Sequence, residues 1–154
     1  MTTRRHRTIG SLQRAIDILE LFDEQTTELG ITEMSEALGL HKSTAAGLVY
    51  ALEDNGYLDQ DAASRKYRLG YMLVERAFTL LDQIDVREAA LPQIQELHDW
   101  FDESVNLALR DGAHVIYIEN LNTTRSLRMC SKVAYRAHVH STALGKAILS
   151  QLSQ

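Results

Sequence analysis

The segment at residues 42–54 constrains the fold of this chain most, because it is amphipathic with two unlike faces. Apolar residues recur along one side at helical spacing: Ala45, Leu48, Val49 and Leu52. Small, hydroxyl and aromatic residues make up the other side: Ser43, Ala46, Gly47 and Tyr50, with Thr44 at its margin. Such a face is unusual for a helix that meets only water. Either a partner molecule contacts it, or the segment is an ordinary core helix of a small bundle.

Two shorter helices are predicted before this segment. The first covers residues 12–22 with Ser11 as its N-cap, and the second covers residues 32–38 with Thr32 as its N-cap. The residues that the second helix is expected to bury are Met34, Ala37 and Leu38. Gly39 then stands where a tight turn needs a positive φ, which glycine adopts without steric cost.

A β-hairpin is predicted directly after the segment. Asn55 and Gly56 end the helix, and β-like runs at residues 57–60 and 66–69 flank a polar tip. The two-residue period of a strand divides the second run into an apolar and a basic face. The apolar face holds Tyr67 and Leu69, and the basic face holds Lys66 and Arg68.

The order of three helices and a two-stranded wing over residues 10–70 is that of a winged helix-turn-helix domain, whose third helix enters the major groove of DNA. The first turn of that helix and the wing would meet phosphates, and the basic arm at residues 1–9 would enter a minor groove. The residues predicted to contact DNA are Arg4, Arg5, Arg7, Lys42, Ser43, Thr44, Gly47, Tyr50, Arg65, Lys66 and Arg68. For Lys66 and Arg68, a solvated strand face is the alternative interpretation.

The net charge of −5 opposes DNA binding, so the prediction depends on where the positive charges lie. Residues 1–69 carry eight Lys and Arg against eleven Asp and Glu. Seven of these eight cations lie in the arm, at the start of the third helix or in the wing, and the acidic residues cluster elsewhere. This distribution is compatible with a DNA-binding surface.

The second half of the chain changes from helices to strands, which predicts an α+β fold. Helices are expected at residues 71–81 and 86–101, where Pro92 should kink the second helix or lie near its first turn. The first of these is apolar nearly all round, so it is either a dimer seam or a core element. Strands are expected at residues 105–110 and 114–119 around an Asp111–Gly112 turn, and near residues 126–131. A last helix should begin near Thr142.

Five motifs resemble the isocitrate lyase regulator (IclR) family of bacterial transcription factors. They are SLQRA at 11–15, ALGLHKST at 37–44, LEDNGY at 52–57, KYRLG at 66–70 and HSTALGKA at 140–147. The resemblance implies a dimeric or tetrameric repressor or activator, with a winged domain, a helical linker at residues 71–103 and a GAF-like α/β effector-binding domain from residue 104. It also implies a small-molecule effector, such as an organic acid or aromatic catabolite, in a cavity lined by Leu127, Met129, Ala143 and Leu144.

The chain departs from the family pattern in two respects. Many members carry a bulky pair such as His-Arg where this chain has Ala46 and Gly47, so the usual arginine contact to guanine is absent. Close approach of the helix backbone to DNA at Gly47, with more contact from Tyr50, is one interpretation. Effector domains of the family also continue well beyond residue 154. A truncated, dimerising form that acts without an effector is therefore the alternative function.

Other classes of function find little support in the sequence. No nucleophile–base pair or paired carboxylates indicate an enzyme, and no cofactor is expected. His138 and His140 lack further metal ligands at suitable spacing, so no metal site is predicted. No window reaches the roughly 18 apolar residues of a membrane span. The lone Cys130 cannot form an intrachain disulfide, which favours the cytoplasm.

Overall fold

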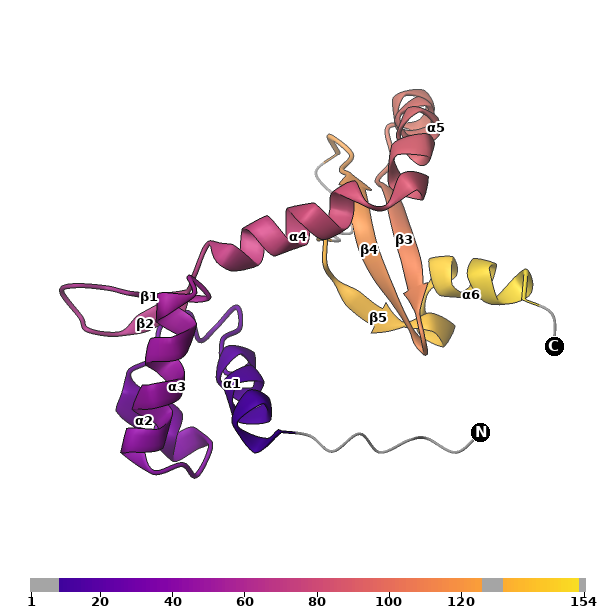
Figure 1. Cartoon of the computed structure of the whole chain (residues 1–154). Helices are drawn as coiled ribbons and strands as arrows, with labels where there is room; N and C mark the ends of the chain where they lie inside the picture. The colour runs from indigo at the N-terminus through magenta and orange to yellow at the C-terminus, as the bar shows by residue number, and fades with distance from the viewer. Residues whose placement is uncertain (1–8, 126–131, 153–154) are drawn as a thin grey trace. The chain divides into compact units, whose positions relative to one another are not determined.

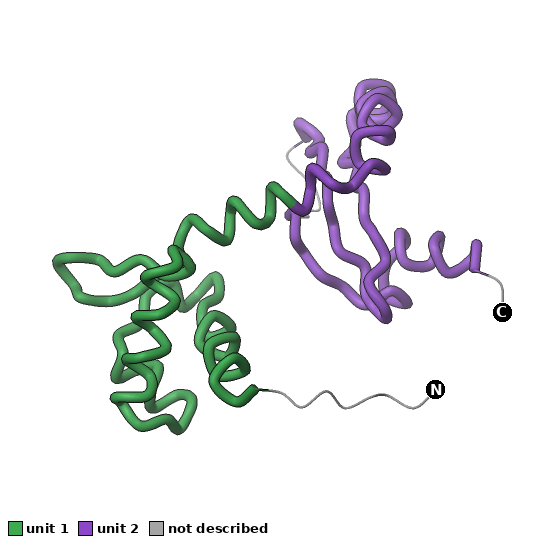
Figure 2. Tube along the Cα trace, in the orientation of Figure 1, with its two compact units in different colours: residues 1–79 green, residues 80–154 purple. Residues whose placement is uncertain are grey.

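The computed structural model describes residues 9–125 and 132–152, and the chain divides into two compact units, Met1–Thr79 and Leu80–Gln154 (Figures 1 and 2). Its elements confirm the predicted α+β class. The basic arm with Arg4, Arg5 and Arg7, the predicted strand at residues 126–131, and the effector residues Leu127 and Met129 lie outside the described residues.

Three helices form the body of the first unit: α1 (Gly10–Glu20), α2 (Ile31–Ala37) and α3 (Lys42–Asp54). The bounds of α3 are those predicted, and Gly39 has the positive φ (62°) expected in the turn before it. Two predicted N-caps are wrong. Ile9 stands at the cap of α1, and Gly30 at that of α2. Glu33 supplies the cap of α2 instead, because its Oε2 accepts a hydrogen bond from the Gly30 amide at 2.6 Å.

The core of the first unit lies where the three helices meet the wing. Its buried members are Ile18, Phe22, Met34, Val49, Leu58 and Tyr67. The predicted core face of α3 is confirmed, whereas Ala37 of α2 is exposed. Ser35 is buried in its place, and its hydroxyl donates to the Thr32 carbonyl at 2.8 Å. A short polar side chain can be buried there because this bond satisfies it.

The wing is a two-stranded antiparallel hairpin, β1 (Leu58–Gln60) and β2 (Tyr67–Leu69), which projects beyond α3 in Figure 1. Tyr67 is 1% exposed and anchors β2 in the core. It also exchanges two backbone hydrogen bonds with Leu29, which adds an isolated third bridge to the hairpin. Because Tyr67 points inward, its neighbours Lys66 and Arg68 extend from the other face, as predicted.

Helix α4 (Met72–Asp82) follows the wing and buries none of its residues in the chain as described. Its exposed large apolar residues are Val74, Phe78 and Leu80, and Tyr71 just before it is 80% exposed. The apolar surface that the sequence predicted is therefore present and uncovered in the single chain.

The second unit combines a three-stranded antiparallel sheet with three helical segments. Its elements are α5 (Asp85–Phe101), β3 (Val105–Asp111), β4 (His114–Leu121), β5 (Arg136–His138), the 3₁₀ turn η1 (Val139–Ser141) and α6 (Ala143–Ser150). The strand order is β3-β4-β5, and α5 and α6 both contact β3 and β4. The predicted turn at Gly112 is confirmed by its φ of 59°. Pro92 lies in the interior of α5, not near its first turn as one alternative had it.

Helix α6 begins as predicted after Thr142. The Thr142 hydroxyl oxygen accepts a hydrogen bond from the Gly145 amide at 2.9 Å, which caps the helix. A Cβ atom at Gly145 would overlap the Val139 carbonyl, so only glycine fits where α6 meets η1. Strand β5 was not predicted. None of the helices in the described ranges is long and apolar enough to cross a membrane.

Candidate nucleic-acid interface

The first turn of α3 carries a histidine cap that the sequence analysis missed. The Nδ1 atom of His41 accepts a hydrogen bond from the Ser43 amide at 3.4 Å and lies 2.8 Å from the Ser43 hydroxyl oxygen. Because a backbone amide donates to Nδ1, the ring proton belongs on Nε2 in this arrangement. Histidine is not among the residues preferred at N-caps, so composition gave no signal for it. The contact fixes Ser43 at the exposed start of the helix.

The predicted DNA-contact residues of α3 lie on its uncovered side. Lys42, Ser43, Thr44, Gly47 and Tyr50 are all exposed. A Cβ atom at Gly47 would meet no other atom within 4 Å, so packing inside the chain does not require glycine there. Glycine in a helix interior costs about 1 kcal/mol relative to alanine. Gly47 thus lowers the stability of α3 although no contact within the chain requires glycine. A partner molecule that approaches the helix backbone at Gly47 would explain it.

The tip of the wing is an ordered turn that holds Arg65 outward. The Asp61 carboxylate accepts backbone hydrogen bonds from Ala63 at 3.1 Å and from Ser64 at 2.7 Å. These bonds, with that from Ser64 the largest, hold the pKa of Asp61 below its ordinary value. Arg65 has a positive φ of 59°, and its carbonyl accepts a hydrogen bond from the Gln60 side-chain Nε2 at 3.0 Å. The Arg65 side chain is exposed.

The other two wing cations are ion-paired within the chain. The Arg68 guanidinium donates to a single oxygen of Asp59 from Nε at 2.9 Å and from Nη2 at 2.6 Å. The Lys66 ammonium donates to Glu33 at 3.1 Å. Both pairs are about half exposed. The wing therefore presents two of its three cations beside carboxylates, an arrangement that charge counting along the sequence did not reveal.

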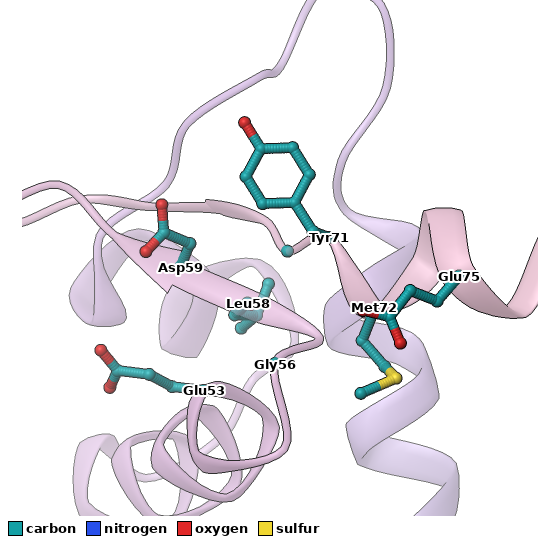
Figure 3. A pocket seen from close by; sticks show the side chains of 8 residues that line it. Glu53, Gly56, Leu58, Asp59, Tyr71, Met72 and Glu75 are labelled. Atoms are coloured by element: carbon teal, nitrogen blue, oxygen red, sulfur yellow. The ribbon is translucent and has the colours of Figure 1, made fainter.

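A pocket of about 360 Å³ lies beside the wing, between the end of α3 and the start of α4 (Figure 3). It is lined by Glu53, Gly56, Leu58, Asp59, Gly70, Tyr71, Met72 and Glu75. Three of these lining residues are acidic and none is basic, so the lining offers no cation to an anionic ligand. An organic-acid effector therefore has no basis for binding here.

The described effector candidates lie at the start of α6. Ala143 is exposed, and Leu144 is half-buried against the cluster of Val115, Tyr117 and Val139. Packing against this cluster accounts for Leu144 without a ligand. Its assignment to an effector cavity stays a prediction that follows from the family resemblance.

Three histidine rings of the second unit lie close together, His114 on β4, His138 on β5 and His140 in η1. The ring centroids of His114 and His138 lie 4.6 Å apart, and those of His138 and His140 lie 5.4 Å apart. The rings of His138 and His140 are stacked with an interplanar angle of 25°. Within residues 9–125 and 132–152, no three metal-ligating side chains are placed to hold an ion.

Comparison with known proteins assigns both halves of the chain to one family. The model of the IclR helix-turn-helix domain matches residues 11–62, and that of the bacterial transcriptional regulator IclR C-terminal domain matches residues 78–154. The HTH-type transcriptional regulator XynR of Escherichia coli K12 is 39% identical over 146 residues, which are 95% of this chain and 58% of XynR.

Two solved structures extend the similarity to the fold. The IclR protein of Thermotoga maritima is 26% identical with a TM-score of 0.75, over 93% of this chain and 57% of that one. An IclR homologue of Microbacterium hydrocarbonoxydans complexed with 4-hydroxybenzoate is 25% identical with a TM-score of 0.74, over 94% and 60%. The chain thus spans somewhat more than half the length of these relatives. It belongs to the IclR family of bacterial transcriptional regulators.

Proposed function

We propose that this chain is a sequence-specific DNA-binding transcriptional regulator, in which α3 enters the major groove. The observation that carries the proposal is the uncovered face of α3, from Lys42 through Gly47 to Tyr50, on a helix whose opposite face packs in the core. A major groove admits one α-helix, and the wing stands beside that helix.

Each part of the interface has a separate task in this proposal. The Ser43 hydroxyl, the first-turn amides and Lys42 bind phosphates, because the start of a helix offers N–H donors and a positive dipole end. Arg65, Lys66 and Arg68 bind phosphates that flank the groove, and the arm with Arg4, Arg5 and Arg7 enters the adjacent minor groove. Phosphate contacts fix the register of the domain, and base edges supply the sequence information.

The base-reading contacts come from the middle of α3. Gly47 lets the helix backbone approach the bases closely, since no side chain stands between them. Tyr50 lies one helical turn further on the same face and is 50% exposed, so its ring and hydroxyl can reach base edges. A Gly–Tyr face reads through shape and apolar contact more than through the bidentate hydrogen bonds of arginine.

The active form in this proposal is a homodimer, or a tetramer built from it, that contacts DNA at two half-sites. Helix α4 supports dimerisation, because Val74 and Phe78 are exposed on one side of it at i and i+4. A two-fold dimer binds a palindromic operator, with half-sites about one helical turn of DNA apart or a multiple of it.

The effector in this proposal is a small organic acid or aromatic catabolite, bound in the second unit near Leu127, Met129, Ala143 and Leu144. The Microbacterium homologue was solved in complex with 4-hydroxybenzoate, which is both aromatic and an organic acid.

A fluorescence anisotropy titration tests the proposal. The protein is titrated into a labelled pool of duplexes from upstream regions at low salt, and the same pool of single strands serves as the competitor. We expect duplex binding that a single-stranded pool does not displace and that weakens steeply with salt, because phosphate contacts release counterions. Equal affinity for single strands and duplex, or none for either, would overturn the proposal.

A further inference from the structure

Two carboxylates of the winged unit are held against the cations that the proposed function directs at DNA. We propose that Asp59 and Glu33 are affinity-setting residues, which compete with DNA phosphates for Arg68 and Lys66. This inference rests on the proposed function and adds that two carboxylates lower the affinity of the wing for DNA phosphates. It concerns the two wing cations that are ion-paired within the chain.

The Arg68–Asp59 pair is built into the register of the hairpin. Asp59 and Arg68 are direct cross-strand partners, so their side chains leave the same face of the sheet side by side. Two donors of Arg68 are used on one Asp59 oxygen, at 2.9 and 2.6 Å. The hydrogen bond to Asp59 is also the largest cause of the raised pKa of Arg68. An Arg68 that binds a phosphate with this edge must first leave Asp59.

The Lys66–Glu33 pair connects the wing to α2. One oxygen of Glu33 accepts from Lys66 at 3.1 Å, while the other accepts from the Gly30 amide at 2.6 Å. These two bonds, with the Gly30 amide first, hold the pKa of Glu33 below its ordinary value, so Glu33 stays ionised at neutral pH. The helix cap prevents Glu33 from following Lys66 towards DNA.

The carboxylates are fixed, whereas the cations are long and flexible. Asp59 has a short side chain and lies in strand β1, and the Glu33 carboxylate is hydrogen-bonded to the Gly30 amide at the N-terminus of α2. Both pairs are about half exposed, so solvent and a phosphate can reach them. Exposed ion pairs are weak in water. A DNA phosphate and the carboxylate therefore compete for each cation, so in wild type each cation contacts a phosphate in only part of the complexes.

The test uses Asp59→Asn and Glu33→Gln in the whole chain, with a fluorescein-labelled 30-base-pair duplex of random sequence as the probe. Random sequence is sufficient because phosphate contacts do not depend on base identity. Asparagine keeps the shape of Asp59, and glutamine at position 33 can still accept from the Gly30 amide. We expect each variant to bind the duplex roughly three- to tenfold more tightly than wild type at 50 mM salt, with Asp59→Asn the stronger.

Salt dependence gives a second readout. One additional phosphate contact steepens the slope of log K against log salt by about 0.9. The advantage of Asp59→Asn over wild type should therefore shrink roughly threefold between 50 and 200 mM salt. A change in affinity with an unchanged slope would contradict a freed phosphate contact.

Two controls separate direct competition from a general change of charge. Asp61→Asn removes the same charge two residues away on the same wing, where the carboxylate accepts backbone hydrogen bonds from Ala63 and Ser64. In an Arg68→Gln background, Asp59→Asn should no longer tighten binding, because its competitor is gone. A double-mutant cycle of Asp59 and Arg68 gives the coupling directly.

The outcomes are distinct. Equal gains from Asp59→Asn and Asp61→Asn, or an undiminished gain in the Arg68→Gln background, would overturn the inference. A loss of affinity in Asp59→Asn would also overturn it, because Asp59 would then position Arg68 for DNA. If wild type binds the duplex and the two variants bind it with the same affinity, only this inference is overturned. Wild type that binds no duplex at low salt overturns the proposed function as well.

Discussion

Gly70 approaches Gly56 so closely that a Cβ atom at position 70 would overlap the Gly56 carbonyl oxygen. Two backbone hydrogen bonds hold this contact, from Gly70 to the Tyr57 carbonyl at 2.8 Å and from Met72 to the Gly56 carbonyl at 3.1 Å. The end of the wing is thereby fixed against the end of α3. This contact sets the position of the wing relative to the helix proposed to enter the groove.

Replacing Gly70 by alanine should therefore destabilise the winged unit. The overlap falls on backbone atoms, which cannot rotate away, so we expect a loss of about 1–3 kcal/mol in the free energy of unfolding. Urea denaturation followed by circular dichroism measures it. A variant Gly70→Ala with the midpoint of wild type would show that this close contact does not form.

Gly47→Ala should have the opposite effect on stability. The added Cβ meets nothing within 4 Å, and alanine is the better helix former, so we expect a gain of up to about 1 kcal/mol. Duplex binding should weaken at the same time, because the methyl group separates the α3 backbone from the bases. The same urea series and an anisotropy titration measure both. A stabilised variant with unchanged affinity would contradict close approach at Gly47.

Much of this architecture could be predicted from the sequence because it depends on local patterns. The spacing of apolar residues predicts the bounds of α3 correctly, and the Asp111–Gly112 pair predicts the turn between β3 and β4. The predicted N-cap of α2 is wrong because threonine is a preferred N-cap residue, whereas the actual N-cap is Gly30, whose amide donates to the Glu33 carboxylate. Strand β5 has only three residues and is held by pairing with β4, which a local pattern cannot report.

The second unit should lose stability in acid through Asp102. Hydrogen bonds to its carboxylate, with the Thr124 amide the largest cause, hold the pKa of Asp102 below its ordinary value of 3.8. A lowered folded-state pKa contributes stability that is present above pH 3.8 and is lost as the pH falls through the lowered value. Asp102→Asn keeps an acceptor oxygen and should flatten this dependence.

The fluorescence of Trp100, the single tryptophan of the chain, monitors this unfolding from α5. Urea midpoints are compared at pH 5 and at pH values below 3.8. Asp111→Asn is the matched control, because Asp111 is a carboxylate of the same unit whose ion pair with Arg136 is exposed to solvent. If Asp102→Asn and wild type lost the same stability between these conditions, Asp102 would not be the group that titrates.

Phe78→Glu should prevent self-association. Phe78 is 60% exposed in the single chain, so a glutamate there leaves the monomer fold intact and places a charge in the proposed α4 seam. Light scattering coupled to gel filtration measures the mass. Arg76→Glu is the control, since it adds the same carboxylate on the other side of α4 with a larger change of charge. A wild-type monomer, or equal effects of the two variants, would contradict dimerisation through this face.

The candidate interface was less predictable than the fold. Position along α3 identified Lys42, Ser43 and Tyr50 as exposed residues, because helical periodicity decides which side faces outward. The partners of Lys66 and Arg68 could not be found in this way, since Glu33 and Asp59 reach them across elements. Counting charges by segment treated the wing as basic, whereas folding places a carboxylate beside two of its cations.

Duplex binding by Lys42→Gln and by Lys146→Gln, measured as a function of salt, tests whether α3 is the helix that binds DNA. Both lysines are exposed near the start of a helix, one in α3 and the other in α6. We predict that Lys42→Gln weakens binding of every duplex and lowers the magnitude of the salt slope by about 1, while Lys146→Gln matches wild type. Equal effects of the two substitutions, or no effect of Lys42→Gln, would contradict the assignment of α3 as the helix that binds DNA.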